Sequence, residues 1–303
     1  MRLHGVLPDS AISLLPALAA SVLLLATACA PVEEDAEPAA PESSTAEESP
    51  SDDACATEQL ALKNPDQLTV GTDSPAFEPW FSDNDPTNGE GFESAVAYAV
   101  AEELGFTEDQ VDWVKVPFNN SYAPGEKDFD FDINQISITP ARAEVVDFSD
   151  GYYEASQALI ALKGSPAAEA TTVDELSGLK LGAQTGTTSL TVIRDVIQPE
   201  QQEGVFDDTN AAKQALNNGQ IDGFLADLPT AFFITAVEIP KATIVGQFQP
   251  TEGEKEEFGL LFEKGSELVP CVNEALASLR DSGALADLEQ QWLSDVVDVP
   301  VLQ

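Results

Sequence analysis

An arginine occupies the first turn of a predicted helix in the run ISITPARAEVVDFSDGYY. Thr139 can serve as the N-cap and Pro140 fills the first helical position, so Arg142 lies where the helix dipole is positive. A cation is unfavourable there, whereas an anion is favourable. Because Arg142 breaks this local rule, the sequence indicates a functional role for it. The alternative is a structural salt bridge to a nearby acid, Glu144 or Asp147.

A second candidate site is Gly186-Thr187-Thr188-Ser189, which stands between a predicted strand and a predicted helix. Free backbone N–H groups at a helix start, together with hydroxyls, can bind an anion. An ordinary N-cap explains the same residues equally well.

Several chemistries are excluded by what the chain lacks. Its single histidine is His4, in the leader described below, so no Ser-His-Asp or Cys-His arrangement and no histidine-ligated metal is expected. Neither phosphate-binding glycine motif occurs, and we expect no cofactor and no metal. The formal net charge of −41 disfavours nucleic acid and anionic lipid as partners and suits a saline habitat. These absences favour a binding protein over an enzyme.

The N-terminus reads as an export signal. Residues 1–28 carry Arg2 and His4 before a short apolar run, and they end in Ala-Thr-Ala before Cys29. Small residues before a cysteine resemble a bacterial lipobox, which implies that Cys29 is lipidated and that the membrane is reached only through this anchor. Residues 29–58 are rich in acids, Pro, Ala and Ser, which predicts a disordered tether.

The remaining cysteines form an even pair. With Cys29 lipidated, Cys55 and Cys271 are left, and outside the cytoplasm two thiols can form a disulfide. Such a bridge would join the start of the folded domain to the predicted helix CVNEALASL. Two buried free thiols are the alternative.

Strand and helix patterns alternate along the rest of the chain, which predicts an α/β fold with largely parallel sheets. The main predicted elements are strands at 66–73, 111–118, 129–139 and 156–164, helices at 91–106 and 211–220, a strand–loop–helix unit at 180–197, and two closing helices in LVPCVNEALASLRDSG and LADLEQQWLSDV.

In order along the chain, LTVGTD, GFESAVAYAVAEELGF, ISITPARAEVVDFSDGYY, LGAQTGTTS and NGQIDGFLADLPTA resemble the amino-acid class of bacterial ABC-transporter solute-binding proteins, family 3. The resemblance implies a two-lobe periplasmic-binding-protein-like (type II) fold, an α/β fold with a hinged cleft between the lobes. Lobe 1 would hold residues 60–154 and 248–303, and lobe 2 residues 155–247. Closure on ligand would be a hinge motion that the permease reads.

The same resemblance assigns roles to single residues. Arg142 would hold the ligand α-carboxylate through its planar fork. Thr187 and Thr188 would add to that carboxylate site from lobe 2, and Asp227 would bind the α-ammonium group. Ser137, and Gln135 through its backbone, would form the rim that receives both groups.

The loop GTDSPAFEPWF supplies further predicted contacts. Asp73 and an aromatic ring match ligand-contacting positions of the family. That ring is Phe77 or Trp80, because the loop is one residue longer than the common pattern; a core position for Trp80 is equally compatible. Glu78 is a candidate for ligand selectivity.

The sequence thus predicts a monomeric, lipid-anchored extracytoplasmic protein that binds a free amino acid and delivers it to ABC permease subunits. One alternative is a dehydratase-like enzyme on the same fold, with Glu78 or Asp73 as its acid–base groups. The other is a sensor that passes ligand to a receptor. Asp73 and Glu78 favour a cationic or amide side chain without deciding which amino acid is bound.

Overall fold

A computed structural model describes residues 54–248, 255–293 and 299–302. The predicted leader, Cys29 and most of the predicted tether lie outside this part of the chain. None of the helices that the structure describes is long and apolar enough to cross a membrane.

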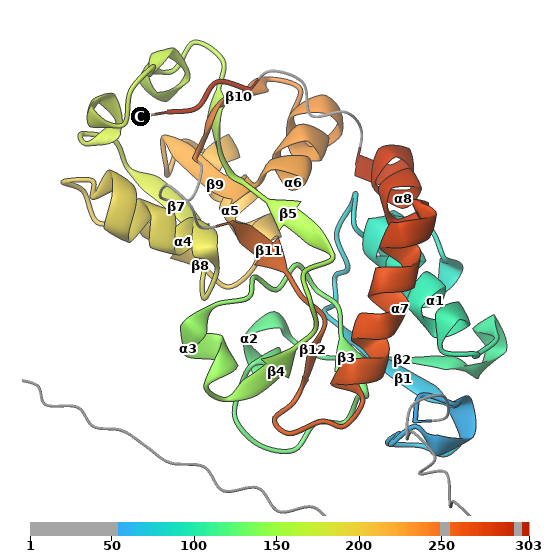
Figure 1. The fold of residues 1–303 in the computed structure, drawn as a ribbon. Coiled ribbons are helices and arrows are strands. Elements are labelled where there is room, and N and C mark those ends of the chain that lie inside the picture. The colour runs from blue at the N-terminus through green and yellow to red at the C-terminus, as the bar shows by residue number, and fades with distance from the viewer. Residues whose placement is uncertain (1–53, 249–254, 294–298, 303) are drawn as a thin grey trace, which may run out of the picture. The chain divides into compact units, whose positions relative to one another are not determined.

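The described residues form short strands separated by helices (Figure 1). The strands are β1 (Leu68–Thr72), β2 (Val111–Lys115), β3 (Phe131–Asp132), β4 (Val146–Phe148), β5 (Tyr153–Ala155), β6 (Gln157–Leu162), β7 (Leu181–Gln184), β8 (Gly204–Phe206), β9 (Gly223–Asp227), β10 (Ala242–Phe248), β11 (Glu256–Phe258) and β12 (Leu261–Glu263). The α-helices are α1 (Phe92–Glu103), α2 (Phe118–Ser121), α3 (Pro140–Ala143), α4 (Thr188–Thr191), α5 (Thr209–Asn217), α6 (Leu228–Phe233), α7 (Val269–Ser282) and α8 (Ala284–Leu293).

Two sheets define two lobes. Lobe 1 contains the sheet β2-β1-β3-β12-β4, with α1, α7 and α8 packed against one another beside it. Lobe 2 contains the sheet β10-β6-β9-β7-β8, against which α4, α5 and α6 pack. The two-lobe α/β fold predicted from the sequence is therefore confirmed.

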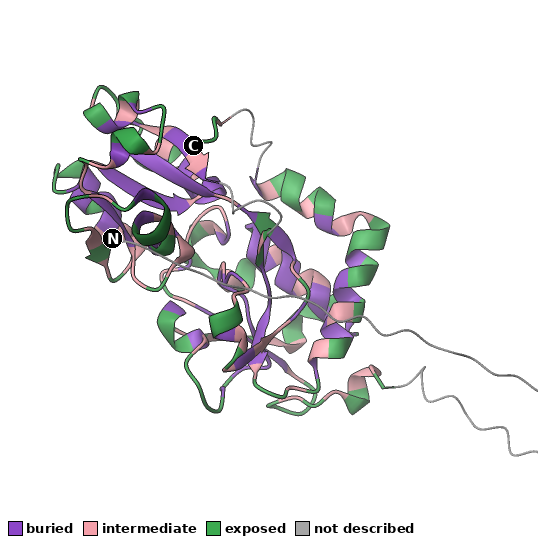
Figure 2. Ribbon diagram, turned by 60° about the vertical axis from the view of Figure 1, so that its left-hand side comes forward, coloured by how far each residue is buried: buried purple, intermediate pink, exposed green. Residues whose placement is uncertain are grey.

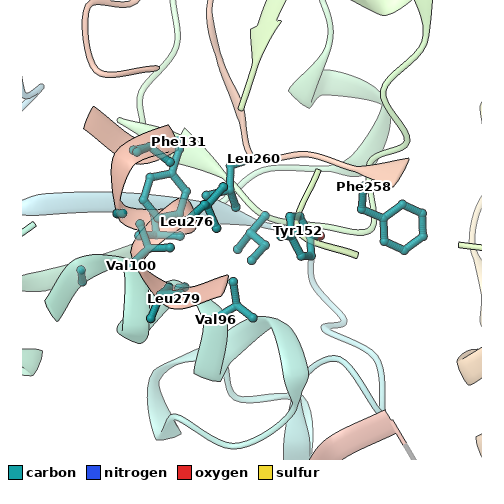
Figure 3. Close-up of a cluster of buried hydrophobic side chains, with 14 of the residues drawn as sticks. Val96, Val100, Phe131, Tyr152, Phe258, Leu260, Leu276 and Leu279 are labelled. Atoms are coloured by element: carbon teal, nitrogen blue, oxygen red, sulfur yellow. The ribbon is translucent and has the colours of Figure 1, made fainter. Parts of the chain in front are cut away.

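The two lobes have separate cores. In lobe 1 the core joins α1, β3 and α7, and Figure 3 shows side chains from these elements converging. The labelled members are Val96, Val100, Phe131, Tyr152, Phe258, Leu260, Leu276 and Leu279. In lobe 2 the strands are mostly buried (Figure 2). Two clusters of apolar side chains pack against this sheet. Continuous apolar runs such as Ala158–Ala161 follow from this double burial.

The strand directions differ from the prediction. Antiparallel pairings are as numerous as parallel ones in the two large sheets among the described residues. The reason is that the chain crosses between the lobes through β5 and through β11. These two strands pair with each other antiparallel between the two sheets (Figure 1). The strands that adjoin these crossings, β6 and β12, enter their sheets antiparallel to β9 and β3.

The predicted domain limits need two corrections. Residues 299–302 were assigned to lobe 1, but Val301 pairs with Gln247 and Leu302 packs into the lobe 2 core. The tether was predicted to reach residue 58, but Thr57 begins a 3-10 turn and its hydroxyl donates to the carbonyl of Leu104 at 2.8 Å. This hydrogen bond attaches Thr57 to the end of α1, so the chain is already fixed to lobe 1 before residue 58.

The predicted disulfide is confirmed. Cys55 and Cys271 are bridged across 216 positions, with their Cα atoms 5.3 Å apart. Cys271 is buried in α7, so the bridge attaches the start of the domain to the lobe 1 core.

Candidate functional site

A cavity lies between the lobes at the ends of β9 and α3, with a free volume of about 50 Å³. That volume exceeds the roughly 10–15 Å³ that one water needs by the same kind of measure. Most of the residues predicted to contact a ligand line it. Lobe 1 contributes Asp73, Phe77, Gln135, Ser137 and Arg142, and lobe 2 contributes Thr187, Thr188 and Asp227.

Arg142 forms the cationic wall of the cavity. Thr139 caps α3 as predicted, accepting a hydrogen bond from the Arg142 backbone N–H at 3.3 Å. The side chain is 8% exposed, and its guanidinium donates to the carbonyls of Ser137 at 2.7 Å and Gly186 at 2.9 Å. Since Gly186 belongs to lobe 2, Arg142 bridges the two lobes.

The environment of the guanidinium is aromatic rather than anionic. Its carbon lies 4.6 Å from the ring centroid of Tyr122 and 5.6 Å from that of Phe118. Burial lowers the pKa of Arg142, and the nearby Tyr122 phenol opposes that shift. Among the described residues Arg142 has no ion pair, and Asp147 pairs with Lys264 at 2.7 Å instead. A buried cation of this kind favours an incoming anion.

The two threonines of lobe 2 differ in how free their hydroxyls are. Thr187 is the N-cap of α4: its Oγ1 accepts from the N–H of Leu190 at 3.2 Å and donates to the carbonyl of Gln184 at 2.8 Å. Thr188 Oγ1 lies 3.4 Å from Ser137 Oγ across the cavity. Thr188 is therefore the more available hydroxyl.

The turn at Gly186 requires glycine. Its φ of +77° is in the left-handed region, and a Cβ there would collide with Asn119 and Tyr122 of lobe 1. The absent side chain lets the Gly186 carbonyl reach Arg142 across the cleft.

Asp227 forms the anionic wall. It ends β9, immediately before the proline-containing first turn of α6, and its Oδ1 accepts from Gln157 Nε2 at 2.7 Å. Burial and then the neighbouring Glu256 carboxylate raise the pKa of Asp227 to about 7. A cation entering the cavity would favour its ionised form.

Gln135 is held in place by a buried acid. Its backbone φ is +48°, and its backbone N–H donates to Glu93 Oε1 at 2.6 Å. The Gln135 side chain and the Tyr152 hydroxyl also donate to Glu93. Burial raises the pKa of Glu93 to about 7, although these hydrogen bonds oppose the shift. Glu93 thereby fixes the backbone that leads to Ser137.

Comparison with known proteins decides the family. The sequence model of the bacterial extracellular solute-binding proteins, family 3, matches residues 68–295. The chain belongs to this family.

Individual relatives are amino-acid-binding proteins by name. The L-cystine-binding protein TcyJ of Escherichia coli (strain K12) is 27% identical over 76% of this chain and 84% of its own length. The arginine-, lysine-, histidine-binding protein ArtJ of the thermophilic bacterium Geobacillus stearothermophilus matches in structure with a TM-score of 0.64 at 26% identity, over 77% of this chain and 96% of its own. The ancestral amino acid-binding protein AncCDT-1, a precursor of cyclohexadienyl dehydratase, has a TM-score of 0.62 at 27% identity, over 75% and 95%.

Two predicted contacts of this solute-binding protein lie away from the cavity. Trp80 is fully buried, and its ring packs edge-to-face on Phe92, Tyr153 and Phe258. The Trp80 carbonyl accepts from the N–H of Glu93, which attaches the backbone of this loop to the start of α1. The Trp80 indole N–H donates to Thr230 of lobe 2 at 2.8 Å, so this residue joins the lobes.

Glu78 accepts from the backbone N–H of Asp83 at 3.1 Å and faces a separate hollow of about 210 Å³. Phe77 remains as the aromatic wall, with Lys213 Nζ 5.5 Å from its ring centroid. Asp73 also stays in the wall, where its Oδ2 accepts from the Phe118 N–H at 3.1 Å.

Several residues in and around the site were not predicted, among them Phe118, Tyr122, Gln157 and Glu256. Gln157 carried a signal, since it is a polar residue beginning the apolar run QALIAL of β6. Glu256 carried none, because its contacts with Ser137 and Gln157 join positions 119 and 99 residues apart.

Proposed function

We propose that this protein captures one free amino acid between its lobes and delivers it to an ABC permease. The observation that carries the proposal is the pairing of opposite charges across one cavity. Arg142 enters from lobe 1 and Asp227 from lobe 2, and both line the same space. A free amino acid carries one carboxylate and one ammonium, so its two ends match these two walls.

The α-carboxylate binds the Arg142 guanidinium and the Thr188 hydroxyl. The guanidinium of Arg142 has five N–H donors, and its hydrogen bonds to protein carbonyls use two of them. The other donors are available to the ligand. The α-ammonium binds Asp227, Ser137 and the backbone at Gln135. Because the ligand contacts both lobes, all of its bonds form only when the lobes are together, and binding shifts the population to the closed state.

The side chain of the ligand is neutral or cationic. Among the described residues lining the cavity, Arg142 is the single cationic side chain, and the α-carboxylate occupies it. Asp73 offers a carboxylate beside the Phe77 ring, which suits a cation or an amide. An acidic side chain would meet no cation here.

Binding without turnover is the function we favour over a dehydratase. The likeness to AncCDT-1 supports the enzyme alternative, yet that protein is itself described as an amino acid-binding protein. Glu78, one of the two acid–base candidates, faces away from the cavity. The lipid anchor at Cys29, the monomeric state and the choice between transport and sensing belong to the same proposal and rest on the sequence pattern and the family.

Isothermal titration calorimetry of the purified protein with each of the twenty amino acids tests the proposal. We expect micromolar or tighter binding of one or a few. Arg142→Ala should weaken this binding by about 100-fold or more, since truncating a buried charge partner costs roughly 2–5 kcal/mol. Arg142→Lys keeps the charge but loses the planar guanidinium, so its affinity should lie between that of the unmodified protein and that of Arg142→Ala.

Arg194→Ala is the matched control, because Arg194 pairs with Glu203 on the exposed surface of lobe 2. It should bind like the unmodified protein. If the unmodified protein bound none of the twenty amino acids, the amino-acid proposal would be rejected. An unchanged affinity in Arg142→Ala would reject the assigned site.

A further inference from the structure

A hydrogen-bond network stands directly behind the anionic wall. Gln157 Nε2 donates to Asp227 Oδ1 at 2.7 Å and lies 3.2 and 3.3 Å from the two carboxylate oxygens of Glu256. Glu256 also accepts the hydroxyl of Ser137 at 2.7 Å. Glu256 lies on the crossing strand β11, so its carboxylate joins Ser137 of lobe 1 to Gln157 of lobe 2.

The direction of these hydrogen bonds determines what the wall can bind. A hydroxyl has one proton and two lone pairs, and a carboxylate can only accept. The Ser137 proton therefore points to Glu256, which leaves the Ser137 lone pairs for Thr188 and for the cavity. The amide protons of Gln157 are likewise directed at carboxylates, while its Oε1 accepts from the Ser189 hydroxyl.

We propose that Glu256 is a positioning residue of the ammonium site: it keeps Ser137 as a hydrogen-bond acceptor and Gln157 against Asp227, so that the cavity selects ligands with a protonated amine. The inference rests on the proposed function and adds a residue that does not itself line the cavity. A ligand with the same carboxylate but no amine would give Ser137 and Asp227 no donor of its own, and Asp227 would keep only the hydrogen bond from Gln157. Sites that hydrogen-bond a ligand group reject analogues lacking it by factors of about 10⁴.

A pH profile reports the same contact. The charged and titratable groups around Asp227 are Glu256 of β11, Glu93 of α1, Arg142 of α3, and Tyr152 and Tyr153 at β5. Burial is the main reason that the pKa of Asp227 is raised, and Glu256 adds to it. Ammonium binding needs the ionised carboxylate, so affinity should rise with pH through about 7 and then level off.

The experiment compares Glu256→Gln with Glu257→Gln. Glu257 is the next residue of β11, but it is exposed and lies against Gly151, so its replacement removes the same charge without touching the network. Each variant is titrated with the amino acid that binds and with the acid in which hydrogen replaces its amino group, for example L-glutamine with glutaramate or L-arginine with 5-guanidinopentanoate. The ratio of the two affinities measures selection for the amine.

We expect Glu256→Gln to lower this ratio about tenfold or more, the size of one lost charge-assisted hydrogen bond. The pH at which affinity rises should also move downward. Glu257→Gln should change neither quantity. In a Ser137→Ala background, Glu256→Gln should lower the ratio by a smaller factor, because only the contact of Glu256 with Gln157 remains.

Glu256→Asp provides a second variant, which keeps the charge but withdraws the carboxylate by one carbon. It should lower the ratio while leaving the pH of the rise nearer to that of the unmodified protein. An unchanged ratio in both Glu256 variants would overturn the inference while amino-acid binding stands, and so would an equal decrease in Glu257→Gln. Absence of binding by the unmodified protein would instead reject the proposed function, and this inference with it.

Discussion

Three acids of the domain are buried or half-buried without forming an ion pair among the described residues. Glu93 and Asp132 are fully buried, and Asp227 is half-buried in the cavity wall. Glu93 is compensated by hydrogen bonds from Gln135 and Tyr152, whereas both carboxylate oxygens of Asp132 lack a partner among the described residues. Burial raises the pKa of all three, that of Asp132 well above its usual range.

This arrangement predicts how stability depends on pH. In the unfolded chain Glu93 has its ordinary pKa of 4.5, and in the folded protein its pKa is about 7. The folded state therefore holds the proton more tightly, its stabilising effect is complete below about 4.5, and it is lost as pH rises toward about 7. The difference corresponds to about 3 kcal/mol. Asp132 and Asp227 act in the same direction.

Glu93→Gln tests this prediction by urea unfolding between pH 4.5 and 7.5. The neutral amide should flatten the decline of unfolding free energy across that range. Glu103→Gln, an exposed acid of the same helix α1, should leave the slope as it is in the unmodified protein. A slope that is the same in all three proteins would show that Glu93 does not titrate with folding.

At the scale of elements, the helices and strands determined by local sequence patterns were predicted better than the features that depend on contacts between distant segments. The helix predicted at 91–106 contains α1, because apolar spacing and the flanking glycines Gly91 and Gly105 determine it locally. The strand predicted at 66–73 contains β1, because a run of β-branched and apolar residues determines it locally. Thr139 as the cap of the helix that carries Arg142 was also predicted locally, from a capping residue followed by Pro140 at the first helical position.

Features that depend on pairing between distant segments were not predictable in this way. The antiparallel entry of β12 depends on how the chain crosses between lobes, and the place of Leu302 depends on the β10 edge. Trp80 carries no local signal that separates a cavity wall from a core, because the rings that surround it in the core include the distant residues Tyr153 and Phe258.

The Cys55–Cys271 bridge is the element-scale feature with the largest predicted effect on stability. It closes a loop of 216 positions, for which the chain-entropy model gives about 5 kcal/mol. The double variant Cys55→Ala, Cys271→Ala should lose a stabilisation of about this size in denaturant unfolding. Ligand affinity should change little, because neither cysteine lines the cavity.

Reduction of the unmodified protein supplies the control for that experiment. A reductant should lower its unfolding free energy toward that of the double variant and leave the double variant itself unmoved. Equal sensitivity of both proteins to the reductant would contradict a role for this bridge.

At the scale of the whole molecule, charge is the dominant feature. The chain carries 54 acids against 13 Lys and Arg, and the described residues contain ion pairs at five places. The remaining acids repel one another, which destabilises the compact state more than the expanded one. Salt shortens the Debye length from about 10 Å at 0.1 M to about 3 Å at 1 M and so weakens that repulsion.

We therefore predict that the unfolding free energy rises with sodium chloride and levels off as screening becomes complete. Sodium sulfate at equal ionic strength separates screening from the exclusion of salt from the protein surface, which also stabilises compact states. Equal gains in the two salts would identify screening of the net charge as the cause. A larger and still rising gain in sulfate would assign the effect to exclusion, and a flat response in both would show that the acids are too well hydrated or too far apart to repel. Because protonation of the same acids also removes repulsion, the salt effect should be smaller at pH 4.5 than at pH 7.5, which links this measurement to the titration of the buried carboxyls.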